Sequence, residues 1–127
     1  MDSIVHFEIP ADDTERAKKF YKGVFGWQID DMPEMNYTIL RTAKIGKDMM
    51  PTEPGRINGG MMKRSKEIAH PVVTIAVDDI DATLKKLEKA GGKTVMGKQS
   101  IGGMGFTAYF KDSEGNVIGL WQMAIQP

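Results

Sequence analysis

Residues 5–13 read VHFEIPADD, and a shift of 66 positions lays them on residues 71–79, which read PVVTIAVDD. The same shift aligns Gly26 with Gly92. Each copy has an apolar segment of strand length, then two aspartates suited to begin a helix, then a glycine suited to end it. A repeat of roughly 60 residues exceeds the unit of a solenoid, so we expect two halves of one pseudo-symmetric structure.

The repeat sets the expected domain organisation. Further along, a shift of 69 positions aligns residues 35–39 with residues 104–108. We therefore expect a single domain over residues 1–127, with one module at residues 1–64 and a second at residues 70–124.

The first strand of the repeat has one apolar face. Val5, Phe7 and Ile9 fall on one side of it, and His6 and Glu8 fall on the other. Because an apolar face packs against a helix, this alternation predicts that His6 and Glu8 point the opposite way, into a cleft.

Each half continues with a helix and three strands, so the predicted order is β-α-β-β-β, twice. The first helix is expected to begin near Asp13 and to bury a stripe of apolar residues at i, i+3, i+4 and i+7. That stripe is Ala17, Phe20, Tyr21 and Val24. The predicted strands cover residues 4–9, 27–31, 37–43, 56–63, 72–77, 93–96, 105–111 and 117–123.

Composition excludes several classes of function. The 17 basic and 17 acidic side chains give a net charge of zero, which argues against nucleic acid and anionic membranes as partners. Without cysteine there is no disulfide, zinc–thiolate site or thiol nucleophile. No apolar run approaches the ~20 residues that span a bilayer, and residues 1–3 do not read as a signal peptide. We expect a soluble, cytoplasmic protein.

Three motifs carry a resemblance to a known family. They are HFEIP at residues 6–10, FYKGVFGW at residues 20–27 and FKDSEGN at residues 110–116. Together with the duplication, they resemble the vicinal oxygen chelate superfamily, which includes glyoxalase I, extradiol dioxygenases, and fosfomycin- and bleomycin-resistance proteins. The resemblance implies an α+β fold in which two βαβββ modules form a curled mixed sheet around a cleft, and it implies a homodimer.

The resemblance also implies a divalent metal, held by side chains from the first and last strands of each half. His6 matches the first-strand ligand, but its counterpart Val72 has no donor atom. The last-strand positions fall on Gly119 and on either Gly59 or Gly60. A catalytic metal needs about three protein ligands. We therefore expect the usual metal site to be lost, and no cofactor, with His6 as the one surviving candidate ligand.

His6 and Glu8 are the candidate catalytic residues. His6 can serve as a general base or hydrogen-bond donor, and Glu8, ~7 Å along the same strand face, can orient the ring. The alternatives are a histidine satisfied by neighbours and a salt bridge at the strand end. His70 lies two positions before Val72, on the same predicted strand face, and is a further candidate for the missing ligand.

Four positions are expected to line a ligand pocket: Gly60, Val72, Gly119 and Trp121. Glycine in a strand leaves space for a ligand, or relieves crowding where backbones approach closely. Trp121 falls on the Gly119 face of its strand, where it can wall a cleft; otherwise it is a core or interface residue.

Two functions are consistent with these residues. The first is a glyoxalase-like enzyme of the lyase type, acting on a small molecule through a non-standard site at His6 and Glu8. The second is a non-catalytic protein that binds and sequesters a small molecule, as bleomycin-resistance proteins do.

Overall fold

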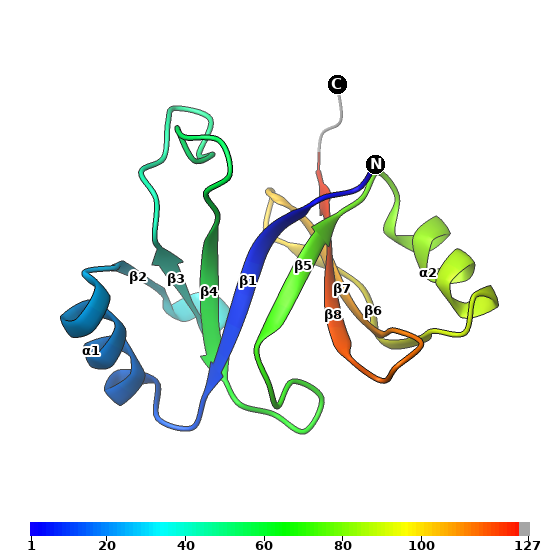
Figure 1. Cartoon of the computed structure of the whole chain (residues 1–127), viewed down its shortest axis with the longest axis horizontal. Helices are drawn as coiled ribbons and strands as arrows, with labels where there is room; N and C mark the ends of the chain where they lie inside the picture. The colour runs from blue at the N-terminus through cyan, green and yellow to red at the C-terminus, as the bar shows by residue number, and fades with distance from the viewer. Residues whose placement is uncertain (125–127) are drawn as a thin grey trace. The chain divides into compact units, whose positions relative to one another are not determined.

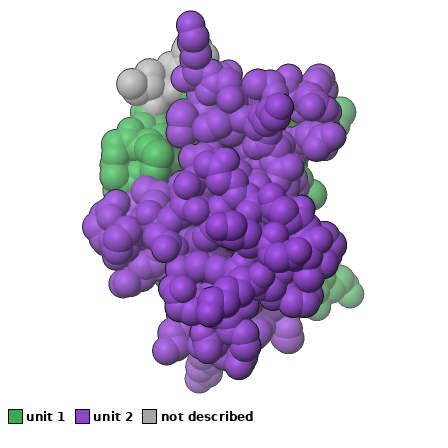
Figure 2. All heavy atoms as spheres, turned by 90° about the vertical axis from the view of Figure 1, so that its left-hand side faces the viewer, with its two compact units in different colours: residues 1–5, 72–127 green, residues 6–71 purple. Residues whose placement is uncertain are grey.

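A computed structural model describes residues 1–124 and divides the chain into two compact units. The first unit is residues 6–71 (purple, labelled unit 2 in Figure 2); the second is residues 1–5 together with residues 72–124 (green, labelled unit 1). The first five residues join the second unit, where the Ser3 carbonyl accepts a hydrogen bond from the amide of Ala76 at 2.9 Å.

In the first unit, one helix lies beside a four-stranded sheet (Figure 1). The strand order is β2-β3-β4-β1, with β1 parallel to β4 and the other pairs antiparallel. The elements are β1 (Ile4–Ala11, of which residues 6–11 are in this unit), α1 (Thr14–Phe25), β2 (Gln28–Met32), a 3-10 helix η1 (Pro33–Met35), β3 (Tyr37–Arg41) and β4 (Asn58–Lys63).

The second unit repeats this plan, with strand order β5-β8-β7-β6 and β5 parallel to β8. Its elements are β5 (Val72–Ala76), α2 (Ile80–Lys89), β6 (Lys93–Ile101), β7 (Gly105–Lys111) and β8 (Val117–Met123). The predicted β-α-β-β-β order and the α+β class are confirmed. Strand β6 runs five residues further than predicted, because register shifts against β7 break the simple alternation that sequence patterns detect.

Both helices begin at the predicted aspartates. The Asp13 carboxylate accepts from the amide of Arg16 at 3.0 Å, and the Asp79 carboxylate accepts from the amide of Ala82 at 3.0 Å. Helix α1 ends at Gly26, whose φ of 72° is the left-handed conformation that glycine adopts without steric cost. These caps explain why both helix starts could be read from the sequence.

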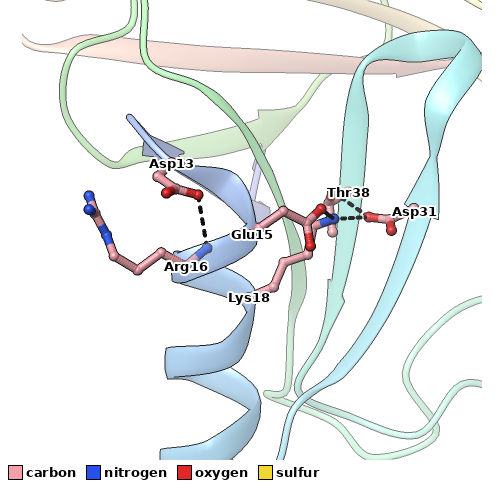
Figure 3. Close-up of polar contacts among 6 residues, drawn as sticks. All are labelled: Asp13, Glu15, Arg16, Lys18, Asp31 and Thr38. Carbon is pink, nitrogen blue, oxygen red and sulfur yellow. Dashed lines mark hydrogen bonds and ion pairs between the residues drawn. The ribbon is translucent and has the colours of Figure 1, made fainter.

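A group of polar contacts ties α1 to its sheet (Figure 3). Lys18 Nζ lies 2.7 Å from carboxylate oxygens of both Glu15 and Asp31, and Thr38 donates to Asp31 at 2.9 Å. Hydrogen bonds from Lys18 and then Thr38 lower the pKa of Asp31 below its ordinary value. Because Asp31 is on β2 and Thr38 on β3, the group connects α1 to β2 and, through Asp31, to β3.

Each unit has its own apolar core between helix and sheet. In the first, Ala11, Leu40 and Met61 are buried and Phe7 and Ile9 pack against them. In the second, the buried core is Val77, Ile80, Leu84, Ala108 and Leu120.

The sheet face that points away from the helix is called the α1-free face in the first unit and the α2-free face in the second. Neither helix, nor any other helix in residues 1–124, is long and apolar enough to cross a membrane.

The predicted stripe of α1 is only half right. Ala17 and Tyr21 pack against the core, but Phe20 and Val24 are 55% and 60% exposed. Tyr21 stacks on Trp27 with ring centres 4.7 Å apart and planes 7° apart. This contact turns only the Ala17–Tyr21 line of the helix toward the sheet, so helical periodicity alone overstated the buried face.

Candidate active site

Strand β1 brings the two predicted catalytic side chains to the α1-free face. His6 pairs with Asn58 of β4 and Glu8 pairs with Gly60, whereas the intervening Phe7 packs in the helix-side core. The alternation predicted for β1 is therefore present, with His6 and Glu8 on the same side of the sheet.

A third residue, Tyr37 of β3, joins them. Its hydroxyl donates to Glu8 Oε2 at 2.8 Å and lies 2.9 Å from His6 Nε2. Asn36, with a φ of 50°, ends η1 in the left-handed conformation and starts β3 at Tyr37. His6 and Glu8, expected as a direct imidazole–carboxylate pair, are therefore connected through a phenol oxygen.

Gly60 makes this connection sterically possible. A Cβ placed on Gly60 would lie 1.7 Å from the Tyr37 hydroxyl oxygen, well inside van der Waals contact. Of the two positions left open by the sequence, Gly60 faces the site and Gly59 faces the Phe7 ring. The space at Gly60, expected to hold a ligand, is taken by the protein's own Tyr37 side chain.

Burial sets the electrostatics of the site. Glu8 is only 6% exposed, whereas His6 and Tyr37 are partly exposed. Desolvation lowers the pKa of His6 from 6.5 to about 4, because burial disfavours the imidazolium. The ring is therefore neutral at pH 7, with one nitrogen able to accept a proton.

An ion pair lies on the same face of the sheet. Arg41 shares its strand face with Tyr37, and its Nε lies 2.6 Å from Asp30 Oδ2 of β2. The Arg41 side chain is 17% exposed. The α1-free face thus carries one cationic side chain, held in place, on the strand that supplies Tyr37.

The pocket residues predicted in the second half lie on the α2-free face. Val72 is 2% exposed, and the space at Gly119 is taken by Thr74, whose Oγ1 would lie 2.7 Å from an added Cβ. Trp121 is partly buried and, with Ala76 and residues 1–3, lines a hollow of about 430 Å³ within the second unit. The sequence placed Trp121 on the Gly119 side of β8, and the strand register agrees.

The donor set of the site does not fit a divalent metal. His6 Nε2 and Glu8 Oε2 are both hydrogen-bonded to the Tyr37 hydroxyl. Gly60, Val72 and Gly119 have no side-chain atom that could bind a metal. His70 is exposed in the bend before β5. Within residues 1–124, no three His, Cys, Asp or Glu side chains are grouped closely enough to hold a metal ion.

The structural register corrects one part of the repeat alignment. Ile39 pairs with Gly60 in the first unit, and Tyr109 pairs with Gly119 in the second. Two residues back along each strand, Tyr37 therefore corresponds to Thr107, not to Phe106 as the shift of 69 implies. Phe106 packs against the α2 core, on the opposite face of its sheet.

The sequence did not indicate that Tyr37 contacts His6 and Glu8. It predicts only a strand at this position, because β3 has no motif that distinguishes one aromatic residue from another. The available signal was indirect: a glycine at position 60, on the same sheet as two polar residues of β1, implies that some large side chain fills the gap.

A family model and a similar protein of known sequence point to the same family. Residues 3–43 match the family described as bleomycin resistance protein-like N-terminal. A glyoxylase-like domain-containing protein of Didymella fabae is 35% identical over 116 residues, which are 86% of this chain and 84% of that protein.

Two further matches extend the comparison. An inferred glyoxylase of Mycobacterium tuberculosis is 31% identical over 122 residues, covering 91% of this chain but 43% of the relative, so the chain spans less than half of that relative's length. A methylmalonyl-CoA epimerase, solved with methylmalonyl-CoA and NH4+, has a TM-score of 0.66 at 14% identity and covers 98% of this chain and 96% of its own. That likeness is one of fold.

Proposed function

Because this chain belongs to the glyoxalase and bleomycin-resistance, or vicinal oxygen chelate, superfamily, we propose that it is an acid–base enzyme acting on a small carbonyl compound. In this proposal His6 removes a proton from the carbon next to the carbonyl. The observation that supports it is the hydrogen-bonded set of His6, Tyr37 and Glu8, in which a neutral, partly exposed ring is backed by a buried carboxylate.

The lowered pKa of His6 has two consequences for such a step. At pH 7 the ring is in its basic form without prior loss of a proton. However, a ring with a pKa of about 4 holds an added proton poorly, at a cost of about 4 kcal/mol at pH 7. The base therefore works only if the positive charge does not stay on the ring.

The test of the proposal is proton exchange at carbon. The protein is incubated in deuterated water with small α-hydroxy ketones, hemithioacetals and acyl thioesters, and deuterium entry at the α carbon is followed by proton NMR. Thioesters are included because a solved structure of this fold holds methylmalonyl-CoA. We expect exchange with one of these classes, and we expect His6→Gln to slow it about 100-fold or more.

The second histidine supplies the control. His70 is exposed and outside the set, so His70→Gln should exchange at the wild-type rate. Equal rates for His6→Gln and the wild type would contradict the proposal.

We further propose that catalysis needs no metal. Protein treated with a chelator should keep its rate, and titration with nickel, zinc or manganese should show no tight site. A rate that falls on chelation and returns with one of these ions would contradict this part.

A second candidate function is binding and sequestration of a small apolar molecule without turnover. The match of residues 3–43 to the bleomycin-resistance-like family favours it. In that case an aromatic ligand should raise the melting temperature of wild type and His6→Gln alike, with no α-carbon exchange. We also propose, as is usual for this superfamily, that the chain forms a homodimer, which sedimentation analysis measures directly.

A further inference from the structure

Resting on the proposed function, we infer that Tyr37 and Glu8 form a proton relay behind His6. The reacting atom is then His6 Nδ1, and the ring changes tautomer during the reaction without becoming a cation. Tyr37 receives a proton from the His6 ring and passes its own proton to Glu8, which holds it during the reaction.

The direction of the hydrogen bonds assigns the atoms. A carboxylate only accepts, so the single proton of Tyr37 goes to Glu8 Oε2, 2.8 Å away. The Tyr37 oxygen then has no proton left for His6. In the hydrogen bond of 2.9 Å between His6 Nε2 and the Tyr37 oxygen, the donor must therefore be the Nε2–H group of the ring. A neutral imidazole protonated at Nε2 has its lone pair on Nδ1.

The relay accounts for every proton that moves in the proposed step. The substrate C–H bond breaks and its proton forms a bond to Nδ1. In the same step the Nε2 proton passes to the Tyr37 oxygen, and the Tyr37 proton passes to Glu8. Both transfers run along hydrogen bonds that already exist, at 2.9 and 2.8 Å. At the end the ring is neutral, Glu8 is a neutral acid and the negative charge is on the substrate enolate.

Burial favours this outcome over a charged ring. Glu8 is 6% exposed, so protonation removes a buried charge. An imidazolium at His6 would add a second charge to a partly buried site. The relay thus lets a ring that disfavours the cation act as a base.

The relay also narrows the reaction class. It holds one stored proton, and Glu8 must lose that proton before the ring can react again. When Nδ1–H returns its proton to the enolate, the transfers reverse and the site is reset. The arrangement therefore suits isomerisation or epimerisation next to a carbonyl, in which one proton is removed and one is returned.

The first experiment examines the resting protein and needs no substrate. Nitrogen-15 NMR of the imidazole rings in His70→Gln leaves His6 as the only histidine signal. Between pH 6 and 8 we expect a neutral ring with the proton on Nε2 and an unprotonated Nδ1. A proton on Nδ1 in that range would overturn the relay, whether or not the protein has an activity.

The second experiment uses matched tyrosine variants and the α-carbon exchange assay. Tyr37→Phe removes the relay oxygen and should slow exchange about 100-fold, with KM within about twofold. Tyr21→Phe is the control, because Tyr21 lies in the helix-side cluster of the same unit. Equal rates for the two variants, both folded by circular dichroism, would overturn the relay.

The two proposals fail differently. If no carbonyl compound exchanges in the wild type, the proposed function fails, and the ring tautomer still decides the relay. If exchange depends on His6 but not on Tyr37, the function holds and the relay is overturned.

Discussion

The two units present the same sheet with different chemistry on its helix-free face. In the first, a polar set connects β1 and β3 across β4; in the second, the corresponding side chains are small or apolar. In both, a glycine of the last strand leaves a gap, which a hydroxyl from a neighbouring strand fills. The corresponding pairs are His6 and Val72, Glu8 and Thr74, Tyr37 and Thr107, and Gly60 and Gly119.

This difference separates what the scaffold requires from what the chemistry requires. The glycine is common to both units, so close packing above the last strand belongs to the repeated architecture. The occupant of the gap differs: a phenol that reaches two titratable groups in one unit, and a threonine hydroxyl in the other. The site is therefore a property of one unit, and the repeat does not duplicate it.

The largest effect should come from closing the gap at Gly60. In Gly60→Ala the new Cβ would lie 1.7 Å from the Tyr37 hydroxyl, so the tyrosine must leave and its hydrogen bond to Glu8 is lost. Overpacking together with a lost hydrogen bond to a buried carboxylate should cost about 4 kcal/mol of unfolding free energy, and α-carbon exchange should be abolished. Urea unfolding and the exchange assay measure the two effects.

Gly119→Ala is the matched variant in the second unit. Its nearest neighbour is Thr74 Oγ1 at 2.7 Å, a small group that can rotate away. We expect a loss of about 1–2 kcal/mol and no change in the chemistry at His6. Equal losses in the two variants would show that the gaps at Gly60 and Gly119 are equivalent, and would contradict a site confined to the first unit.

The next effect is a dependence of stability on pH that arises in the first unit. The unfolded ring of His6 takes up a proton near pH 6.5, whereas burial holds its folded pKa at about 4. Between these values the unfolded state binds more protons, so stability falls as pH falls from 6.5 to 4. The full loss is about 3 kcal/mol, and it stays constant at lower pH for this group.

The substitution His6→Val copies the second unit and isolates this contribution. Urea unfolding at intervals between pH 7 and 4.5 should show a steeper decline for wild type than for His6→Val. His70→Gln should behave as wild type, because His70 is exposed. Parallel curves for wild type and His6→Val would mean that the His6 ring is not desolvated.

The sequence predicted most of the fold and only part of the site. Strand alternation and aspartate caps are local signals, so β1, β7, β8 and both helix starts could be placed from the sequence alone. His6 and Glu8 followed from the same alternation. Their connection through Tyr37 did not, because it depends on which β3 residue lies over Gly60, and a one-residue error in register moves a side chain to the opposite face.

The smallest effect concerns the helices of the two units. Gly23 lies inside α1, and the shift of 66 aligns it with Lys89 of α2. A Cβ at Gly23 meets no atom within 4 Å and its φ is not positive, so Gly23→Ala should raise the unfolding free energy by about 1 kcal/mol through helix propensity. Gly26→Ala is the opposite case: the same open space surrounds it, but its φ of 72° is costly for alanine, and we expect a loss of about 1 kcal/mol. Thermal unfolding of the two variants should therefore shift in opposite directions. A common direction would mean that α1 does not end where the αL conformation of Gly26 places its last turn.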